Sequence, residues 1–479
     1  MIEHLLLDEP ELEFGDGGKH IDPRYGLLRH GPLQPMLGDK VSIGVIGTGE
    51  TVEGFERWLD RVRSAIPGKS EKQPNLFPPF PGLGNNNPFR CRFELAAHGK
   101  RVLPTRDIAQ ILAIKSQADA VRDAGAMFTD EATAMLEASD KPDVIVVALP
   151  FDLIMRLVND MAPEQEGIEE INNDDSIDFR DYLKAQALHL QRPTQIVWPT
   201  LWDDHARIPR KLKRTTRQVQ DPATRAWNLY TTLFYKAGRV PWRLPRPENQ
   251  LKTSYIGIGF YRDLSGQRLL TSTAQMFDER GRGLILRGER ARTDKGDRRP
   301  YLGRTDAYDL IRRSLKAYYA QHQHYPARVM ILKTARFEDA ETDGFREALT
   351  EAKVAYSDLI WVSESSPINF FREGDYPPLR GTMIGLGDDA LLFTRGSVPY
   401  YRTYPGMRVP IPLMVRPHSN DTPIRDIARD FLALSKMNWN TTQFDGALPI
   451  PIRAARQVGK VLKHVPVGQR EATDYHQYI

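Results

Sequence analysis

The chain has 479 residues, of which 41% are hydrophobic and 27% charged, an ordinary balance for a globular protein of roughly two to four domains. Its single cysteine, Cys91, excludes an intramolecular disulfide and a metal site made of cysteines alone. No run approaches the roughly 18 apolar residues of a membrane span, and the acidic N-terminus lacks a signal-peptide pattern. We therefore expect a cytoplasmic protein without a membrane partner.

The first half of the sequence alternates short apolar runs with helical patterns, as is typical of an α/β layer domain. The runs are continuous rather than alternating, which predicts parallel strands covered on both faces. We expect a Rossmann-like domain, together with an N-terminal segment, over residues 1–247. Its predicted strands are Val41–Ile46, Arg90–Leu95, Val144–Leu149 and Gln195–Trp198, and its predicted helices are Glu53–Ser64, Arg106–Ala124, Glu131–Ser139 and Phe179–Leu190.

A proline cluster, Val240 to Pro247, indicates a connection between domains, and we place the boundary near Glu248. Three antiparallel strands, followed by alternating helices and strands, are the order of a ribonuclease-H-like α/β domain over residues 248–479, which the pattern alone leaves as one option among several α/β folds. Its predicted strands are Ser254–Phe260, Leu269–Phe277, Gly283–Leu286, Arg328–Leu332 and Asp358–Val362, and its predicted helices are Tyr308–His322 and Asp343–Ala352.

A ribonuclease-H-like sheet cuts phosphodiesters with metal ions that carboxylates hold at strand ends. In this sequence the corresponding positions are Gly259 and Thr334, which cannot hold a hard cation as a carboxylate does. We therefore expect no catalytic residues in this domain. An active nuclease that uses the displaced acids Asp263, Glu338 and Asp339 is an alternative, but each lies several residues beyond a strand end.

Two segments concentrate basic residues. From Arg207 to Arg217 six of eleven residues are Lys or Arg and none is acidic, and a second arginine-rich stretch runs from Arg287 to Arg299. Both are candidates to contact phosphates, and solvated surface loops are the simpler interpretation. The candidate nucleic-acid contacts are Arg207, Arg210, Lys211, Lys213, Arg214, Arg217, Arg287, Arg290 and Arg292.

Several longer segments occur in an order that resembles one family. The opening LLLDEPELEFGDGGKHIDPRYGLLRHGP is followed by PDVIVVALP, RPTQIVWPT and DPATRAWNLYTTLFYKAGRVPWRL, and then by SYIGIGFYRD, PARVMILKTARFEDAE and DFLALSKMNWNTTQFDGALPIPIRAA. Together they resemble the short prokaryotic Argonautes, which are reduced to MID and PIWI domains. The resemblance covers essentially the whole chain, although no single motif carries it.

The resemblance implies that the MID domain anchors the 5′-phosphate of a guide strand through a Tyr or His, a Lys, a Gln and a second Lys. Lys184, Gln195 and Lys236 match the last three. Arg180 stands where Tyr or His is usual, and because it lies four residues before Lys184, both side chains face the same way on a helix. Tyr182 is nearby, so either residue is a candidate for the phosphate contact.

The family also implies a magnesium ion in this pocket, shared by guide phosphates and the C-terminal carboxylate. The sequence ends DYHQYI, and its apolar last residue, Ile479, is able to tuck inward and present a carboxylate as a hard oxygen ligand. A frayed tail is the alternative. Trp202, close to the basic segment, is a candidate to stack on the first guide base.

The resemblance further implies a guide RNA, a complementary single-stranded DNA target from a plasmid or phage, and a partner protein. That partner carries an APAZ domain fused to an NAD-hydrolysing effector, and overall likeness favours a sirtuin-like effector over a TIR effector. Backbone and shape would hold the duplex, while base pairing reads the sequence. Recognition of the invader would then deplete NAD.

A dinucleotide-binding oxidoreductase is an alternative from another class. Gly47, Gly49 and Gly54 follow an apolar strand and precede a helix. Their spacing departs from G-x-G-x-x-G, and no acid follows about 20 residues onward at the end of a second strand. A tight glycine turn explains the pattern more simply.

Overall fold

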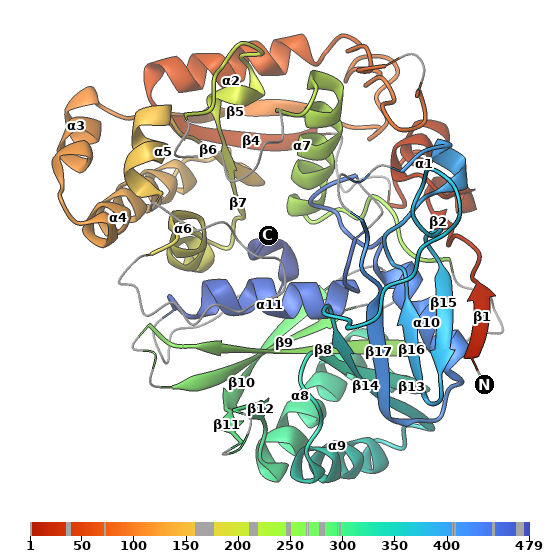
Figure 1. The fold of residues 1–479 in the computed structure, drawn as a ribbon. Coiled ribbons are helices and arrows are strands. Elements are labelled where there is room, and N and C mark those ends of the chain that lie inside the picture. Colours follow the sequence, from red (N-terminus) through yellow and green to blue (C-terminus); the bar gives the residue numbers. More distant parts are fainter. Residues whose placement is uncertain are drawn as a thin grey trace.

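In the computed structural model two α/β units lie one above the other, and the C-terminus lies between them (Figure 1). The structure describes residues 2–479 except 35–39, 71–72, 159–176, 210–218, 246–250, 265, 267, 277–282, 295, 297, 405, 407–408, 443–445 and 466–473. The predicted boundary at Glu248 lies outside the described residues. In the part that is described, no helix is long and apolar enough to cross a membrane.

The amino-terminal unit is a four-stranded parallel sheet in the order β5-β4-β6-β7. Alternate residues of the central strands face different helices: Val144 and Val146 pack with α2 and α7, whereas Ile145 and Val147 pack with α3 to α6. Helices therefore cover both faces, as the continuous apolar runs predict. The elements are β4 (Lys40–Gly47), α2 (Gly49–Arg61), β5 (Arg92–Val102), α3 (Thr105–Ala113), α4 (Gln117–Leu136), β6 (Val144–Ala148), α5 (Phe151–Leu157), α6 (Phe179–Ala187), β7 (Thr194–Val197) and α7 (Pro222–Lys236).

The helix break in this unit differs from the prediction. The sequence analysis divides the helical region around Gly125, but α3 ends at Ala113, and α4 continues through Gly125 to Leu136. Ser116 begins α4, because its side chain accepts a hydrogen bond from the backbone N–H of Asp119. Gly125 is needed for packing instead, since a Cβ there would lie 2.6 Å from the ring of Tyr182.

The carboxy-terminal unit is built on a nine-stranded sheet in the order β1-β15-β16-β17-β14-β13-β8-β9-β10. Its β8-β9-β10 meander is antiparallel, and β8, β13 and β14 are parallel, as expected of a ribonuclease-H-like core. The strands are β8 (Thr253–Arg262), β9 (Leu269–Met276), β10 (Gly283–Arg290), β13 (Arg328–Lys333), β14 (Tyr356–Ser363), β15 (Thr382–Leu386), β16 (Asp389–Leu392) and β17 (Leu413–Asn420), with a separate pair of short strands, β11 (Arg292–Thr293) and β12 (Pro300–Tyr301).

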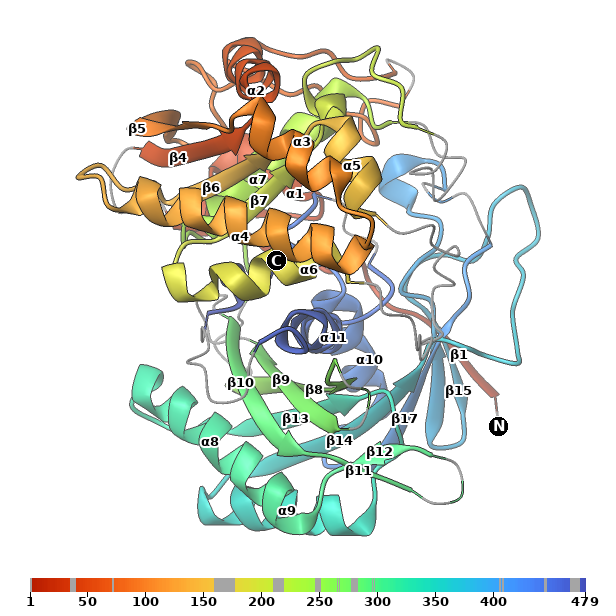
Figure 2. The same ribbon diagram turned by 90° about the vertical axis from the view of Figure 1, so that its left-hand side faces the viewer.

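Helices cover both faces of this sheet, and one of them meets the amino-terminal unit. Helices α8 (Arg304–His322) and α9 (Asp339–Glu351) pack on the outer face, and α10 (Ile424–Leu434) and α11 (Ile450–Leu462) pack on the inner face. Figure 2 shows α11 lying beneath α6. One continuous apolar core therefore includes α7, α11 and the C-terminal residues.

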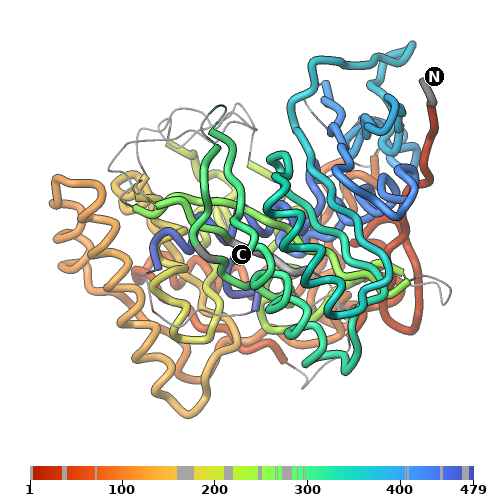
Figure 3. The backbone as a smooth tube through the Cα atoms, turned by 90° about the horizontal axis from the view of Figure 1, so that it is seen from below, coloured from red at the N-terminus to blue at the C-terminus, as the bar shows by residue number. Residues whose placement is uncertain are grey.

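The N-terminal segment joins the carboxy-terminal unit, which differs from the predicted division at residue 247. Strand β1 (Ile2–Leu6) pairs with β15 and forms one edge of the nine-stranded sheet. Glu9, which follows β1, pairs with Arg380 and Lys436 of that unit. In Figure 3 the N-terminus lies at the periphery and the C-terminus near the centre. Strands β2 (Leu12–Glu13) and β3 (Lys19–His20) and helix α1 (Pro23–His30) then lead to the parallel sheet.

Candidate functional site

Two buried lysines meet where α6, β7 and α7 converge. Lys236, the last residue of α7, donates hydrogen bonds from Nζ to the Thr194 carbonyl at 2.7 Å and to Gln195 Oε1 at 2.7 Å. Lys184 of α6 donates to the same Thr194 carbonyl at 3.3 Å and to the main-chain oxygen of Ile479. Three residues predicted from the sequence, Lys184, Gln195 and Lys236, are thus brought together with Ile479.

Helix ends place both ammonium groups. Asp178 caps α6 by accepting from the backbone N–H of Asp181, so Lys184 lies in the last turn, next to the start of β7. Helix α7 is followed by Gly238, whose φ of 78° is the left-handed conformation that favours glycine after a helix. The chain turns away there, and Lys236 remains at the carboxyl end of the helix.

These lysines differ from the other buried lysines in what they pair with. Among the described residues four lysines are buried, and Lys333 and Lys436 each form an ion pair with a carboxylate, Glu341 and Glu9 respectively. The acceptors of Lys184 and Lys236 are instead carbonyl, amide and chain-terminal oxygens. The two ammonium groups therefore share only the terminal carboxylate of Ile479, and because buried charges are costly unless compensated, a bound anion would stabilise this pair.

The pKa shifts of the two lysines also favour a bound anion. Burial lowers the pKa of Lys184 well below its ordinary value, and the charges of Lys236 and Arg180 lower it further. Burial and Arg180 likewise lower the pKa of Lys236. A phosphate between these groups would favour their charged forms and reverse the shift.

The structure separates the two candidates for the first contact. Arg180 lies one turn before Lys184, its side chain is 37% exposed, and it pairs with Asp181 at 2.9 Å. Its positive charge lowers the pKa of both lysines. Tyr182 is on the other side of α6, where its ring packs against Gly125 and against the ring of His464 at 5.7 Å between centroids. Arg180 therefore lies on the same face of α6 as Lys184, and Tyr182 lies on another face.

The C-terminal residues are buried beside the lysine pair. Asp474 pairs with Leu284 of β10, and the chain then forms a 3-10 helix, Tyr475–Gln477. Tyr478 is 0% and Ile479 3% exposed. The tail is thus tucked inward, as the apolar last residue predicts. As a donor set for Mg²⁺, the terminal oxygen of Ile479 is suitable only together with phosphate oxygens and water, which is a common way for proteins to hold this ion.

The edge of the nine-stranded sheet carries the other predicted features. Gly259 lies in β8 opposite Ser272 of β9, and Thr334 directly follows β13. Of the displaced acids, Asp263 accepts a hydrogen bond from the backbone N–H of Arg268, and Glu338 and Asp339 begin α9. The described residues contain no group of three or more His, Cys, Asp or Glu placed to hold a metal ion.

Solved structures share the architecture of the whole chain. An Argonaute of Clostridium butyricum bound to a guide DNA and a 19-mer target DNA matches with a TM-score of 0.64 and 16% identity, over 98% of this chain and 54% of its own. The A. aeolicus Argonaute gives 0.58 and 14%, over 98% and 54%, and Drosophila Piwi gives 0.61 and 13%, over 99% and 56%. The chain has the fold of the Argonaute MID and PIWI domains.

The chain spans little more than half the length of these proteins. No family model and no curated protein matches its sequence. After the folds that they share, we refer to the amino-terminal unit, which holds the lysine pair, as the MID unit and to the nine-stranded unit as the PIWI unit. The predicted fold class, a Rossmann-like domain followed by a ribonuclease-H-like domain, is confirmed.

A hollow beside Gln195 contains residues that the sequence analysis missed. It has a volume of about 440 Å³ and lies between β7, α7 and the PIWI residues that follow α10. Asn228 of α7 accepts from the backbone N–H of Thr442 at 2.9 Å, and Thr232 donates to the Asn440 carbonyl at 3.1 Å. Asn228 lies eight residues before Lys236 on the same helix face, so the sequence contains a signal for it. No local signal points to Asn440.

Only some of the predicted nucleic-acid contacts lie among the described residues. Trp202 packs against Gly54 of α2, where a Cβ would lie 2.4 Å from the indole, and Arg207 is exposed. Arg287 and Arg290 lie on β10 and Arg292 on β11, so these arginines lie on strands and not on one loop. The remaining basic positions of the first segment lie outside the described residues: Arg210, Lys211, Lys213, Arg214 and Arg217.

The glycine-rich turn after β4 has a structural explanation. Gly47 ends β4, and a Cβ there would lie 2.4 Å from Thr51 Oγ1 and 2.6 Å from the Ala148 carbonyl. Thr48 caps α2 by accepting from the backbone N–H of Thr51. Gly54 makes room for Trp202. Each feature is accounted for by packing or capping, which favours the tight-turn interpretation over dinucleotide binding.

Proposed function

We propose that this protein is a guide-binding subunit of the short Argonaute type, and that the lysine pair anchors the 5′-phosphate of the guide. The observation that carries the proposal is the burial of two ammonium groups, 4% and 2% exposed at Lys184 and Lys236, whose hydrogen-bond acceptors include no side-chain carboxylate and only one terminal carboxylate, that of Ile479. A terminal phosphate dianion supplies two negative charges and strong acceptor oxygens. Gln195 and Arg180 would fix its orientation.

Magnesium belongs to the same proposal. The terminal carboxylate of Ile479 lies beside Lys184 and would hold the ion together with oxygens of the guide phosphates. When bound, the ion would neutralise phosphate charge that the two lysines and Arg180 leave uncompensated. Tyr478 and Ile479 are buried beside the site, so the protein's own contribution is to exclude water.

We further propose that the PIWI unit holds paired strands without cutting them. Gly259 within β8 and Thr334 directly after β13 stand at the positions where we expect a nuclease of this fold to need carboxylates. Incubation of the guide-loaded protein with a complementary target and Mg²⁺ or Mn²⁺ tests this, and we expect no guide-dependent product. A product of fixed length would support the alternative that Asp263, Glu338 or Asp339 serves an active nuclease.

An Argonaute that does not cut its target needs a partner protein to act on the cell. We propose that a guide RNA and complementary single-stranded DNA of a plasmid or phage activate, in the cytoplasm, an APAZ-domain protein with an NAD-hydrolysing effector, sirtuin-like rather than TIR. The support is the likeness in segment order set out above. Co-expression with such a partner, followed by an NAD assay with and without guide and target, tests it, and unchanged NAD would contradict it.

The anchoring proposal is tested with Lys184→Met combined with Lys236→Met, which keeps most of the side-chain volume. Two charge-assisted hydrogen bonds are worth roughly 3 kcal/mol or more, so a 5′-phosphorylated guide should bind on the order of 100-fold more weakly. A guide with a 5′-hydroxyl should lose less than about threefold, because its end carries no phosphate for the lysines. Fluorescence polarisation with both guides measures the two dissociation constants.

Lys19→Met combined with Lys316→Met is the matched control, because both lysines are exposed. This variant should bind both guides as the wild type does. Equal losses for the two guides in the Lys184 and Lys236 variant would remove the phosphate assignment, whatever the size of the loss.

A further inference from the structure

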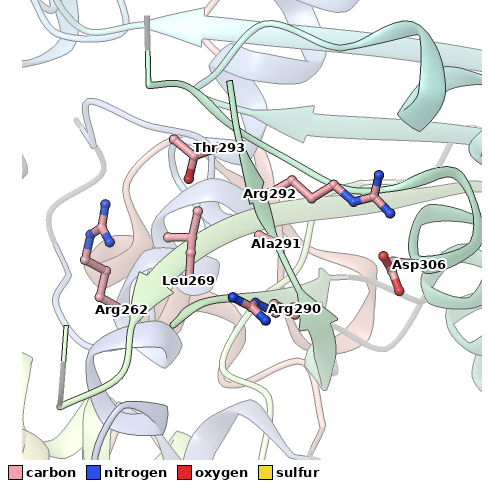
Figure 4. A pocket seen from close by; sticks show the side chains of 7 residues that line it. All are labelled: Arg262, Leu269, Arg290, Ala291, Arg292, Thr293 and Asp306. Carbon is pink, nitrogen blue, oxygen red and sulfur yellow. The ribbon is translucent and has the colours of Figure 1, made fainter. Parts of the chain in front are cut away.

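A second cationic hollow lies at the edge of the PIWI sheet. It has a volume of about 430 Å³ and is formed by the ends of β8 and β10, the start of β9, strand β11 and the first turn of α8 (Figure 4). Arg262, Arg290 and Arg292 line it, and Asp306 is the acid among its lining residues. Three arginines and one acid therefore line the hollow.

The arginines of the hollow differ from their neighbours in their partners. In the described part of the chain the side chains of Arg290 and Arg292 form no hydrogen bond or ion pair, and Arg262 donates only to the Gly266 carbonyl at 3.2 Å. Other arginines on or before α8 have acidic partners: Arg299 pairs with Glu338, Arg304 with Glu347 and Arg312 with Asp309. Arg290 and Arg292 thus keep guanidinium groups beside the hollow that no acid of the described residues neutralises.

Two backbone features influence where Arg290 and Arg292 lie beside the hollow. The pairing of β10 with β9 shifts between Arg287 and Arg290, and such a bulge re-aims the side chains that follow it. At the start of α8, Gly303 takes the N-cap position without a side-chain cap. A Cβ on Gly303 would lie 2.9 Å from Arg292 Nη2, so the glycine lets Arg292 approach the positive end of the helix.

Such a hollow suits a phosphate group. Guanidinium groups bind phosphate oxygens in pairs, and the excess of positive charge offsets the repulsion from Asp306. Because β8, β10 and β13 run in the same direction, the hollow lies at the sheet edge where Gly259 and Thr334 stand. A phosphate held there would need no metal ion.

We propose that Arg262, Arg290 and Arg292 hold a backbone phosphate of the guide–target duplex at this edge, in place of metal ions. The inference rests on the proposed function, since it assumes that a duplex forms on the protein. It assigns the hollow to the backbone of nucleic acid, and a free phosphate or mononucleotide is the competing source of the same chemistry. Binding here would be independent of base sequence and sensitive to salt.

The test uses Arg290→Gln combined with Arg292→Gln, with Arg304→Gln combined with Arg312→Gln as the control. Guide loading is measured first and should equal that of the wild type for both variants. Affinity of the loaded protein for a complementary target should then fall about tenfold in the first variant near physiological salt, and its salt dependence should become shallower by about one to two phosphate contacts. The control should change neither quantity.

Each remaining outcome has a definite meaning. If the first variant matches the control in both affinity and salt dependence, the hollow does not hold the duplex. If inorganic phosphate or a mononucleotide binds the wild type but not this variant, while target affinity is unchanged, the site belongs to a free phosphate and the proposal is overturned. If the wild type loads no guide, the proposed function fails before target is added, and this inference fails with it.

Discussion

The two cationic regions of this molecule are built in opposite ways. Lys184 and Lys236 are buried and bonded to backbone, amide and chain-terminal oxygens, whereas Arg290 and Arg292 are exposed around an open hollow. A buried pair can distinguish a terminal dianion from a hydroxyl, because the cost of leaving it unpaired is high. Exposed arginines can follow a backbone of any sequence but are screened by salt.

The difference also predicts how each region responds to conditions. Charges in the lysine site depend on burial, so the site should be sensitive to anything that admits water or changes protonation. The arginine hollow keeps its charge at every physiological pH, because a guanidinium does not lose its proton. Ionic strength should therefore act mainly on the hollow, and pH and closure mainly on the lysine site.

The largest effect is expected from removing the closure. Deletion of residues 475–479 removes Tyr478 and Ile479, admits water to Lys184 and takes away the oxygen proposed for magnesium. We expect the preference for a 5′-phosphorylated guide over a 5′-hydroxyl guide to fall on the order of 100-fold, since solvation weakens charge interactions severalfold. Competition between the two guides measures the preference directly.

A milder variant covers the case in which the deletion does not fold. Adding Gly-Ser-Gly after Ile479 keeps the buried side chains but converts the terminal carboxylate to an amide. The preference should again fall, and the dependence of guide affinity on Mg²⁺ should weaken. If both guides lose affinity equally in both variants, the tail is a structural brace and not part of the phosphate site.

A pH effect of intermediate size should separate the two regions. The pKa values of Lys184 and Lys236 are lowered in the free protein, and a bound phosphate raises them, so binding takes up protons at a pH between the free and bound values. Affinity for the 5′-phosphorylated guide should therefore fall as pH rises, by up to about tenfold per pH unit for one proton taken up.

The 5′-hydroxyl guide is the control for this measurement, and its affinity should be nearly flat with pH. The phosphate itself becomes singly charged below about pH 6, so the comparison belongs above that value. Isothermal titration calorimetry in buffers of different ionisation enthalpy counts the protons directly. No proton uptake with the phosphorylated guide would show that both lysines are already charged.

The sequence accounts for much of the fold because most strands are continuous apolar runs. Val144 to Ala148 and Arg328 to Lys333 are predicted almost to the residue, since burial on both faces leaves no polar position inside them. The break at Ser116 was misplaced, because Gly125 is a helix breaker by propensity but is required by contact with Tyr182. Only the packed structure contains that contact.

The candidate site, like the fold, can be predicted from the sequence only in part. The family resemblance identifies Lys184, and spacing on one helix puts Arg180 on the same face, but the contact of Lys184 with Ile479 joins residues 295 positions apart. Strand β1 in the PIWI sheet and Asn440 beside α7 are likewise products of tertiary pairing. Local pattern therefore identifies the chemical groups, and the topology decides which of them meet.

The smallest effect should come from the choice between Arg180 and Tyr182. Arg180 faces the lysines but is 37% exposed, so water screens its charge, and Arg180→Gln should lower the affinity for a 5′-phosphorylated guide by about fivefold. Tyr182→Phe removes only a hydroxyl from a ring that packs on α4, and should change it by less than about twofold. The reverse ranking would mean that α6 turns when guide binds, so that Tyr182 replaces Arg180 beside the lysines.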